Sequence, residues 1–307
     1  MMWRGAASLR RYGLVAWLCV VSSLQMTYGQ PITSLRDDDG RPALLGTPAV
    51  RVVTLAPSLT ELVYAAGAGD KLAGASDYSD YPEAARQLSR VADATGISWE
   101  SLLALKPDLV LAWKGGTRPA DIARLNSLGV NVFVIEIKRL NDVSRALRSI
   151  GKLVGRPDPA ERAARLFEQH LATLREANAG KAVVKTFFEI SSKPLMTINR
   201  DHVISEMIGL CGGDNIFADS LALASEPSRE TLLTRNPDAV LYGISLARTR
   251  GVDDETYAGL SAVTAGRMYG ITADYVFRPG PRLLLATEEI CTALDRGREN
   301  LKAQRTR

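Results

Sequence analysis

The fold is decided by two similar stretches, Glu100-Ser-Leu-Leu-Ala-Leu-Lys-Pro-Asp-Leu-Val-Leu-Ala-Trp113 and Glu230-Thr-Leu-Leu-Thr-Arg-Asn-Pro-Asp-Ala-Val-Leu-Tyr-Gly243. They lie 130 residues apart throughout and agree at seven of their fourteen positions. Each predicts a short helix, a break at Pro-Asp and a buried strand. Such a unit is common in α/β proteins, so a chance match stays open. The equal offset and a similar strand-helix lead nevertheless favour two homologous α/β lobes.

The segment before the first copy also has the pattern of an α/β unit. Residues 49–55 predict a strand and residues 59–66 predict a helix. Ser58 is the predicted N-cap of this helix, and Glu61 is predicted to complete a capping box. Residues 72–76 predict a second strand. The N-terminal lobe is therefore expected to start as strand, helix, strand.

A long helix is predicted between the two copies, at residues 158–177. Asp158 is its predicted cap, Pro159 suits the first helical position, and Glu161 can complete a capping box. One apolar stripe is predicted from Ala163, Leu166, Phe167, Leu171 and Leu174. At 1.5 Å per residue the helix spans about 30 Å. Because a flexible hinge would be short and rich in Gly or Ser, we expect a stiff strut and no large closure of the lobes.

The length of 307 residues is enough for two domains of ordinary size. We predict a leader segment at residues 30–48, an N-terminal α/β lobe at residues 49–156 and an inter-lobe helix at residues 157–178. The C-terminal α/β lobe is predicted at residues 179–307.

Residues 1–29 are predicted to be a secretory signal peptide. They combine three arginines, no acidic residue and an apolar run at residues 12–24, which is shorter than the roughly 20 residues that span a bilayer. Small residues at Thr27 and Gly29 predict cleavage after Gly29. The alternative is a membrane anchor, which is disfavoured because no second apolar span follows. Loss of the three arginines lowers the formal charge from +4 to +1, so charge gives no indication of nucleic-acid binding.

Two cysteines, Cys211 and Cys291, remain after removal of this segment. In an oxidising compartment they are most simply explained as one disulfide. A catalytic or metal-binding pair is the sharper hypothesis, but no CxxC and no histidine lies close to either cysteine.

The sequence carries little sign of enzymatic chemistry. The chain has two histidines, His170 and His202, so a three-histidine zinc site is excluded and structural roles are favoured for both. There is no phosphate-binding G-x-x-x-x-G-K-[ST] and no G-x-S-x-G. We expect a binding protein with no catalytic residues, no metal site and no resident cofactor.

Two α/β lobes form a cleft lined by the loops at their strand ends. Four segments are expected to line it: residues 56–58, 78–82, 113–116 and 274–278. They are rich in aromatic side chains, which suit a large flat ligand. Trp113 follows a buried strand, so it can belong to the core or to the cleft, and the cleft is slightly favoured. Tyr78 lies in a polar loop, where core packing is a weaker explanation.

At these segments the chain resembles the cobalamin-binding periplasmic proteins that feed vitamin B12 importers of the ABC type, within the rigid-helix class of solute-binding proteins. The resemblance rests on Val53–Leu62, Tyr78–Pro82, Ala104–Trp113 with Gly115 and Gly116, Cys211–Phe217, Ser228–Glu230 and the region of Cys291. It covers nearly the whole chain after the signal segment. The Ala-Leu-Lys-Pro-Asp-Leu stretch is shared with iron-siderophore and haem receptors, whereas Tyr-Ser-Asp-Tyr-Pro is more particular to the cobalamin branch.

The resemblance implies a class III fold: two Rossmann-like lobes joined by one long rigid helix. It implies a corrinoid ligand and delivery to an ABC permease dimer at the inner membrane by a monomeric periplasmic protein. The implied ligand contacts, together with the cleft segments, are Ser58, Tyr78, Trp113, Met196, Asp274, Tyr275, Val276, Phe277 and Arg278. The family also pairs the cysteines equivalent to Cys211 and Cys291.

Glu100 and Glu230 resemble the two lobe-surface glutamates that dock on permease arginines. One acid at the same place on each lobe suits a two-fold symmetric permease. The alternative is an ordinary glutamate in the first turn of a helix, where the helix dipole favours it. Both roles are compatible.

The chain departs from the family at three aromatic positions. Ala94 and Ala224 stand where reference members have tryptophan, and Met196 stands where they have phenylalanine. These changes enlarge the cleft and weaken stacking. The nearest rival is a haem or ferric-siderophore binding protein in which Tyr78 ligates iron. An exported hydrolase using Asp80 and Asp274 is more distant, and an adhesion or scaffold protein with a filled cleft is a third alternative.

Overall fold

The computed structural model describes Met1, residues 35–244 and residues 255–305. The predicted signal peptide with its cleavage site at Gly29 lies outside these residues, except for Met1. Pro31–Arg307 forms one compact unit. Within the described part of the chain, no helix combines the length and the apolar composition needed to cross a membrane.

The N-terminal lobe is built on a sheet with the strand order β4-β3-β2-β1-β5-β6. The strands are β1 (Val52–Thr54), β2 (Leu72–Ser76), β3 (Ser89–Asp93), β4 (Gly96–Ile97), β5 (Leu109–Trp113) and β6 (Val132–Ile135). All pairs are parallel except β3 with β4. The helices are α1 (Pro57–Ala65), α2 (Trp99–Ala104), α3 (Pro119–Ser127) and α4 (Asn141–Leu153), with 3₁₀ turns η1 (Gly69–Lys71) and η2 (Glu83–Gln87).

The C-terminal lobe is built on a parallel sheet with the order β10-β7-β12-β13. Its strands are β7 (Val184–Glu189), β10 (Gly213–Asn215), β12 (Ala239–Ile244) and β13 (Met268–Thr272). A small antiparallel sheet, β11-β9-β8, is formed by β8 (Ser191–Ser192), β9 (Leu195–Ile198) and β11 (Ala224–Ser225). The helical elements are α6 (Val203–Leu210), α7 (Arg229–Arg235), η3 (Glu255–Tyr257), α8 (Ser261–Thr264), α9 (Ala273–Val276) and α10 (Leu283–Arg305).

The predicted internal repeat is confirmed by the structure. Its copies fall on α2–β5 and α7–β12, and β2-β1-β5-β6 in one lobe has the same order and direction as β10-β7-β12-β13 in the other. The residue before each repeated proline has the same unusual backbone, with φ of 47° at Lys106 and 40° at Asn236. Residues other than glycine adopt a positive φ infrequently. The recurrence of a positive φ at equivalent positions therefore supports one repeated unit.

The Pro-Asp pair of each copy holds the start of the neighbouring strand. The Asp108 carboxylate accepts hydrogen bonds from the backbone N–H of Val50 at 2.8 Å and of Arg51 at 3.0 Å. In the second lobe the Asp238 carboxylate accepts one from the N–H of Lys185 at 3.0 Å. Backbone bonds from Asp108 to the Arg51 carbonyl and from Asp238 to the Lys185 carbonyl complete the match. The motif therefore sets the register of the central strands, which explains its place in the repeat.

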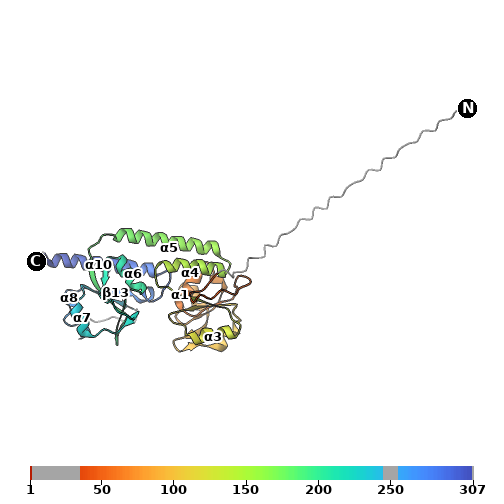
Figure 1. The fold of residues 1–307 in the computed structure, drawn as a ribbon, viewed down its shortest axis with the longest axis horizontal. Coiled ribbons are helices and arrows are strands. Elements are labelled where there is room, and N and C mark those ends of the chain that lie inside the picture. Colours follow the sequence, from red (N-terminus) through yellow and green to blue (C-terminus); the bar gives the residue numbers. More distant parts are fainter. Residues whose placement is uncertain (2–34, 245–254, 306–307) are drawn as a thin grey trace. The chain divides into compact units, whose positions relative to one another are not determined.

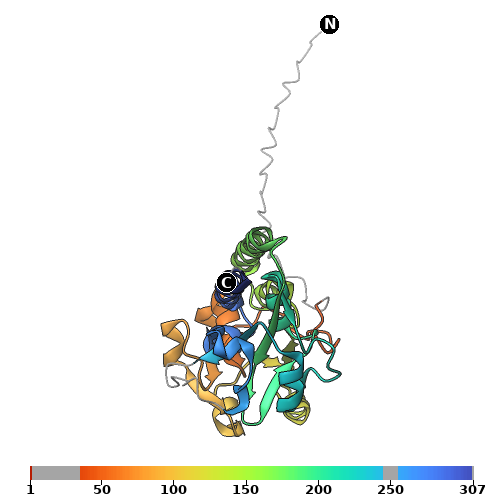
Figure 2. The same ribbon diagram turned by 90° about the vertical axis from the view of Figure 1, so that its left-hand side faces the viewer.

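The inter-lobe helix α5 (Pro157–Asn178) lies beside α4 and α10, as Figures 1 and 2 show. It begins one residue before the predicted cap, at Pro157, and its first turn has no side-chain cap. The predicted capping roles of Asp158 and Glu161 are therefore wrong. The Glu161 carboxylate instead binds Arg148 of α4 at 2.7 Å and Arg165 at 2.7 Å.

The apolar stripe of α5 also differs from the prediction at one position. Leu166 is 67% exposed. The buried residues of the helix that face its neighbours are Ala160, Ala164, Phe167 and Leu171. A Cβ on Gly151 of α4 would lie 2.3 Å from the Ala160 Cβ, so the two helices approach through small residues. This close contact selects the alanine face, and Leu166 turns to solvent.

The start of α1 is a further correction. The helix begins at Pro57, with Ala56 at the N-cap position and no side-chain cap. Ser58 lies inside the first turn and is 3% exposed. Proline is well suited to a first helical position because it has no N–H to satisfy. The Glu61 side chain is 3% exposed and points to the other lobe, so no capping box forms.

Residues 35–48 pack on the N-terminal lobe. Asp38 donates its backbone N–H to the Val134 carbonyl at 3.0 Å, and the N–H of Glu136 binds the Asp38 carboxylate at 2.6 Å. The Asp37 carboxylate accepts a hydrogen bond from the Val134 N–H at 3.3 Å. Ala43 and Leu45 are buried. The leader therefore covers the free edge of β6 and adds to the core of this lobe.

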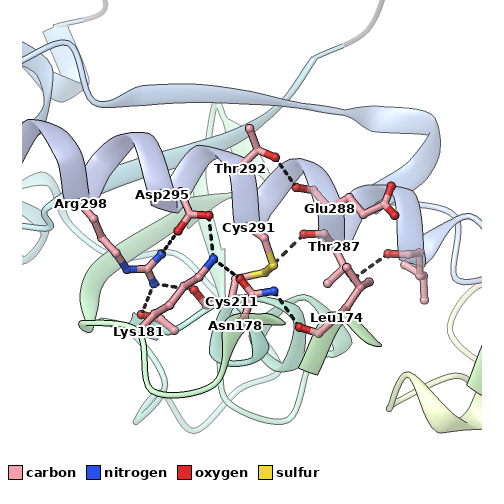
Figure 3. Close-up of a disulfide and its surroundings, with 12 residues drawn as sticks. Leu174, Asn178, Lys181, Cys211, Thr287, Glu288, Cys291, Thr292, Asp295 and Arg298 are labelled. Carbon is pink, nitrogen blue, oxygen red and sulfur yellow. Dashed lines mark hydrogen bonds and ion pairs between the residues drawn. A yellow bond between two sulfur atoms is a disulfide. The ribbon is translucent and has the colours of Figure 1, made fainter. Parts of the chain in front are cut away.

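Cys211 and Cys291 form the predicted disulfide, which joins the end of α6 to α10 (Figure 3). Arg298 of α10 donates hydrogen bonds to the Cys211 carbonyl at 2.6 Å and to the Asp295 carboxylate at 2.7 Å. Lys181 Nζ lies 2.7 Å from Asp295 Oδ2. The disulfide and these polar contacts hold α10 against the C-terminal lobe.

A cluster of charges with a buried centre joins the two lobes. The Glu61 carboxylate on α1 binds Arg282 through Nε at 2.9 Å and through a second nitrogen at 2.5 Å. Arg278 lies 3.5 Å from Glu61, 2.6 Å from Asp80 and 3.0 Å from Asp274. Burial raises the pKa of the Glu61 carboxyl, while the two arginines act in the opposite direction. Because both arginines precede α10, this cluster fixes residues 278–282 of the C-terminal lobe against α1.

We expect Asp108→Ala to lower the free energy of unfolding by about 1–2 kcal/mol, because two backbone N–H groups lose a charged acceptor. Asp214→Ala is the matched control, since Asp214 is exposed on β10 and is expected to have little effect. Urea denaturation followed by circular dichroism measures both. Equal stability of the two variants would contradict the role assigned to the motif.

We expect Glu61→Gln to lower the free energy of unfolding by about 3 kcal/mol, because it leaves a buried guanidinium without its charged partner. Glu83→Gln removes a carboxylate of similar chemistry from an ion pair whose side chains are 60% and 81% exposed, and should change stability by less than about 0.5 kcal/mol. Thermal and urea unfolding of both variants test this contrast. Similar losses of unfolding free energy in the two variants would show that the inter-lobe ion pair contributes no more than an exposed one.

Candidate ligand-binding cleft

A pocket between the two lobes lies at the carboxyl ends of their strands. Its volume is about 270 Å³. The N-terminal lobe contributes Trp113, Gly115, Glu136, Ile137 and Lys138, and the C-terminal lobe contributes Ile190, Asp201, His202, Val203, Leu223, Val276, Phe277 and Pro279. Ligands of open parallel sheets bind at this end of the strands. The pocket is therefore the candidate functional site.

Three of the predicted contacts come together in this pocket: Trp113, Val276 and Phe277. Trp113 ends β5, is half-buried and also packs on the core, so the two roles considered for it both hold. Phe277 is 38% exposed and its ring meets Phe188 edge to face, with centroids 6.2 Å apart. A Cβ on Gly243 would lie 2.3 Å from the Phe277 ring, so the glycine at this repeat position leaves room for the aromatic side chain.

Arg278, Asp274 and Tyr275 lie together beside the pocket. Arg278 has a side chain only 13% exposed, because Asp80 and Asp274 bind it from opposite lobes. Burial alone would raise the pKa of the Asp80 carboxyl, but the Arg278 guanidinium outweighs it and the pKa is lowered. Tyr275 is half-buried and lies under Arg282, whose guanidinium carbon is 5.2 Å from the ring centroid. Both aspartates are thus paired with the Arg278 guanidinium, and for Asp80 the lowered pKa disfavours a role as general acid.

Tyr78 lies in the loop after β2 and is 74% exposed. Its φ of 61° places it at a sharp reversal of the chain. Tyr81 of the same loop is 51% exposed, and the Arg282 guanidinium carbon lies 4.4 Å from its ring centroid. Ala94 is exposed in the turn between β3 and β4. Tyr78 does not line the pocket, and its predicted contact with a ligand stays a prediction.

Ser58 and Met196 also lie outside the set of pocket-lining residues. Ser58 is buried, and its carbonyl oxygen would be 3.4 Å from a Cβ on Gly280 of the other lobe. Met196 of β9 is half-buried and accepts a backbone hydrogen bond from Ile190, a pocket residue, at 2.9 Å. Ala224 of β11 is exposed and pairs with Ile198 of β9. Direct ligand contact by Ser58 or Met196 stays a prediction.

Several pocket residues were missed by sequence reasoning. Glu136, Ile137 and Lys138 directly follow β6, and Ile190 directly follows β7, so the rule that ligands bind at strand ends would have found them. Leu223 lies beside β11, which only the pairing with β9 brings to the pocket. No pattern in the local sequence predicts this position.

The polar rim of the pocket is held by ion pairs. The Glu136 carboxylate lies 3.2 Å from Lys114 Nζ and 3.3 Å from Lys138 Nζ. Hydrogen bonds to Glu136 and Asp39 raise the pKa of Lys114. Among residues 35–244 and 255–305, no three His, Cys, Asp or Glu side chains gather as metal ligands.

Glu100 and Glu230 occupy equivalent first-turn positions, on α2 and α7, and both are exposed. The Ser228 hydroxyl caps α7 by accepting the Thr231 N–H at 3.2 Å. The pKa of the Glu230 carboxyl is lowered, first by its own backbone N–H and then by the Ser228 hydroxyl. Both acids are thus available on the surface of their lobe, as the docking prediction requires.

Comparison with known proteins identifies close relatives. The vitamin B12-binding protein of Vibrio cholerae is 38% identical over 255 residues, which is 82% of this chain and 92% of the relative. That of Yersinia pestis is 38% identical over 243 residues, or 79% of this chain and 85% of the relative. The crystal structure of the Vibrio cholerae periplasmic vitamin B12 binding protein has a TM-score of 0.75 and 37% identity, covering 82% of this chain and 98% of that one.

More distant structures share the fold alone. The periplasmic heme-binding protein RhuT from Roseiflexus has a TM-score of 0.72 and 24% identity, covering 80% of this chain and 98% of that one. The predicted class III architecture of two α/β lobes joined by a long helix is thereby confirmed. The family model described as "Periplasmic binding protein" matches residues 52–275 of this chain. With its repeated lobes, its inter-lobe pocket and this match over most of its length, the chain belongs to the periplasmic binding protein family.

Proposed function

We propose that this protein captures cobalamin or a related corrinoid in the periplasm and delivers it to an ABC permease dimer at the inner membrane. The observation that carries the proposal is an apolar pocket shared by both lobes, in a chain 38% identical to vitamin B12-binding proteins over 82% of its length. A signal peptide at residues 1–29 would direct export. The protein would act as a monomer without a resident cofactor, and no bond would be made or broken.

The pocket has the chemistry that a corrinoid requires. Trp113, Val276 and Phe277 give an apolar floor for one face of the macrocycle. Glu136, Lys138 and Asp201 lie in the same pocket and can meet the amide groups around the ring. A corrinoid is larger than a pocket of about 270 Å³. It would therefore extend beyond the pocket toward the exposed loop of Tyr78.

The contacts between the lobes suit a cleft that changes little on binding. α5 lies beside both α4 and α10, and the Glu61–Arg282 pair joins α1 to the segment that carries Phe277. A preformed cleft loses little conformational freedom on binding, which favours affinity. Exposed acids at Glu100 and Glu230 would then present one charge from each lobe to the permease, whatever the state of the cleft.

Haem is the second candidate ligand, because the exposed side chain of Tyr78 can approach a metal with an open axial position. A corrinoid already holds its cobalt in the plane of the ring. The hydrolase alternative loses support because Asp80 and Asp274 are both bound to Arg278. The scaffold alternative requires a cleft filled by side chains, whereas about 270 Å³ is open.

Titration calorimetry of the purified protein tests the proposal. We expect cyanocobalamin and cobinamide to bind, and Trp113→Leu to raise the dissociation constant about tenfold, because an aromatic wall is lost. Trp99→Leu is the matched control, since Trp99 lies on α2 under Arg124, outside the pocket. No heat with either corrinoid, together with a charge-transfer band on adding haem, would favour the second candidate. Turnover of any ligand that is lost in Asp80→Asn would favour the hydrolase.

Delivery has a separate test. The double variant Glu100→Lys and Glu230→Lys should abolish ligand-dependent uptake by permease-containing vesicles and leave the dissociation constant unchanged, because charge complementarity to the permease is reversed. Glu176→Lys with Glu299→Lys makes the same change of charge at exposed sites on α5 and α10, and should leave uptake intact. Equal loss of uptake and ligand affinity in the first variant would indicate a folding defect instead of docking.

A further inference from the structure

His202 lies in the cleft and begins α6. Its ring nitrogen Nδ1 accepts a hydrogen bond from the backbone N–H of Ile204 at 3.2 Å. The side chain therefore acts as the cap of the helix, which is a structural role of the kind that the sequence favoured. Because the first N–H groups of a helix have no partner within it, this bond has a structural value of its own.

The cap fixes which ring nitrogen carries the proton. A nitrogen that accepts a hydrogen bond must offer its lone pair, so Nδ1 of His202 is unprotonated. The neutral ring then carries its hydrogen on Nε2. Burial lowers the pKa of His202, which keeps the ring neutral at pH 7.

The Nε2–H group is available to a ligand. In the described part of the chain, no residue forms a hydrogen bond with His202 Nε2. Nor is this atom one of the buried polar atoms that lack a partner. The charged pocket residue Glu136 is already bound by Lys114 and Lys138. Asp201 donates its backbone N–H to the Asn199 side chain, and in the described part of the chain it makes no hydrogen bond or ion pair with the imidazole. The helix cap therefore fixes the proton on Nε2, and the Nε2–H group has no hydrogen-bond acceptor in the described part of the protein.

We propose that His202 is a specificity residue that donates a hydrogen bond from Nε2–H to a carbonyl oxygen on the periphery of the bound corrinoid. The proposal rests on the function proposed above. The periphery of a corrin ring carries acetamide and propionamide groups, whose carbonyl oxygens are acceptors. Trp113 and Phe277 in the same pocket would hold the ring by its apolar face, and His202 would select its rotation within the cleft.

The same geometry argues against His202 as an axial ligand of the metal. A metal bound at Nε2 needs the lone pair of that nitrogen, and the proton would then move to Nδ1. A protonated Nδ1 would face the Ile204 N–H, so two donors would meet and the cap of α6 would be lost. Helix capping and metal binding are therefore mutually exclusive in this position of the ring.

Nitrogen NMR on histidine-labelled holoprotein tests the protonation state directly, because the chain has only two histidines. We expect the Nε2–H form of His202 with and without cobinamide, and slower solvent exchange of its Hε2 in the complex. A shift to the Nδ1–H form, with an imidazole-type change in the visible spectrum of diaquacobinamide, would overturn the proposal in favour of metal ligation. Unchanged Hε2 exchange would overturn it in favour of a cap alone.

The variant His202→Asn separates the two uses of the side chain. Asparagine is a good N-cap, so the melting temperature should be kept, while its shorter side chain no longer places a donor at the position of Nε2–H. We expect the dissociation constant for cobinamide to rise about three- to tenfold, as for one lost hydrogen bond. His202→Ala should lose both affinity and thermal stability.

His170→Asn is the matched control, because His170 lies on α5 and binds Glu288 at 2.7 Å outside the cleft. It should leave affinity for cobinamide unchanged. If the wild-type protein binds no corrinoid, the proposed function fails and this proposal fails with it. If the wild type binds and His202→Asn binds equally well, the role of His202 fails while the proposed function stands.

Discussion

The buried ion pair between Glu61 and Arg282 is the contact on which the cleft depends. It joins α1 of one lobe to the start of α10 in the other, across 221 residues of sequence. Phe277 and Arg278 precede Arg282 by a few residues, so the same bond that joins the lobes also positions the floor of the pocket. Removing charges from water is costly, and here the cost falls on Glu61, Arg278 and Arg282, whereas Asp80 and Asp274 stay largely exposed. The cluster therefore fixes the position of residues 278–282 against α1 more than it adds to the free energy of unfolding.

Features set by nearby residues could be predicted from the sequence. The two copies of the Pro-Asp unit indicated two lobes, because a break followed by a run of apolar residues has one common structural outcome. The cap at His202 was not predicted as such, since the sequence favoured only an unspecified structural role for this side chain. The disulfide followed from a count of cysteines in an exported chain. In the cleft, Trp113 was expected from its place at the end of a buried strand, whereas Val276 and Phe277 were expected from an aromatic-rich segment and from the family resemblance.

Features set by distant partners could not be predicted. Ser58 had the pattern of an N-cap, but Pro57 starts the helix and Glu61 turns to an arginine of the other lobe. Leu166 was assigned to the buried face of α5, yet the contact of Gly151 with Ala160 selects a different face. Leu223 enters the pocket only through the pairing of two short strands. Each of these depends on which surfaces meet, and one sequence read locally does not contain that information.

The leader segment affects whether the protein associates with other protein chains. A parallel sheet ends in a strand whose outer N–H and C=O groups invite pairing with another chain. On β6 the backbone of Asp38 and the carboxylates of Asp37 and Asp38 take up these groups around Val134. Residues 35–45 thus act as a guard against intermolecular strand addition. A chain shortened to begin at the first strand would keep its lobes and lose this protection against aggregation.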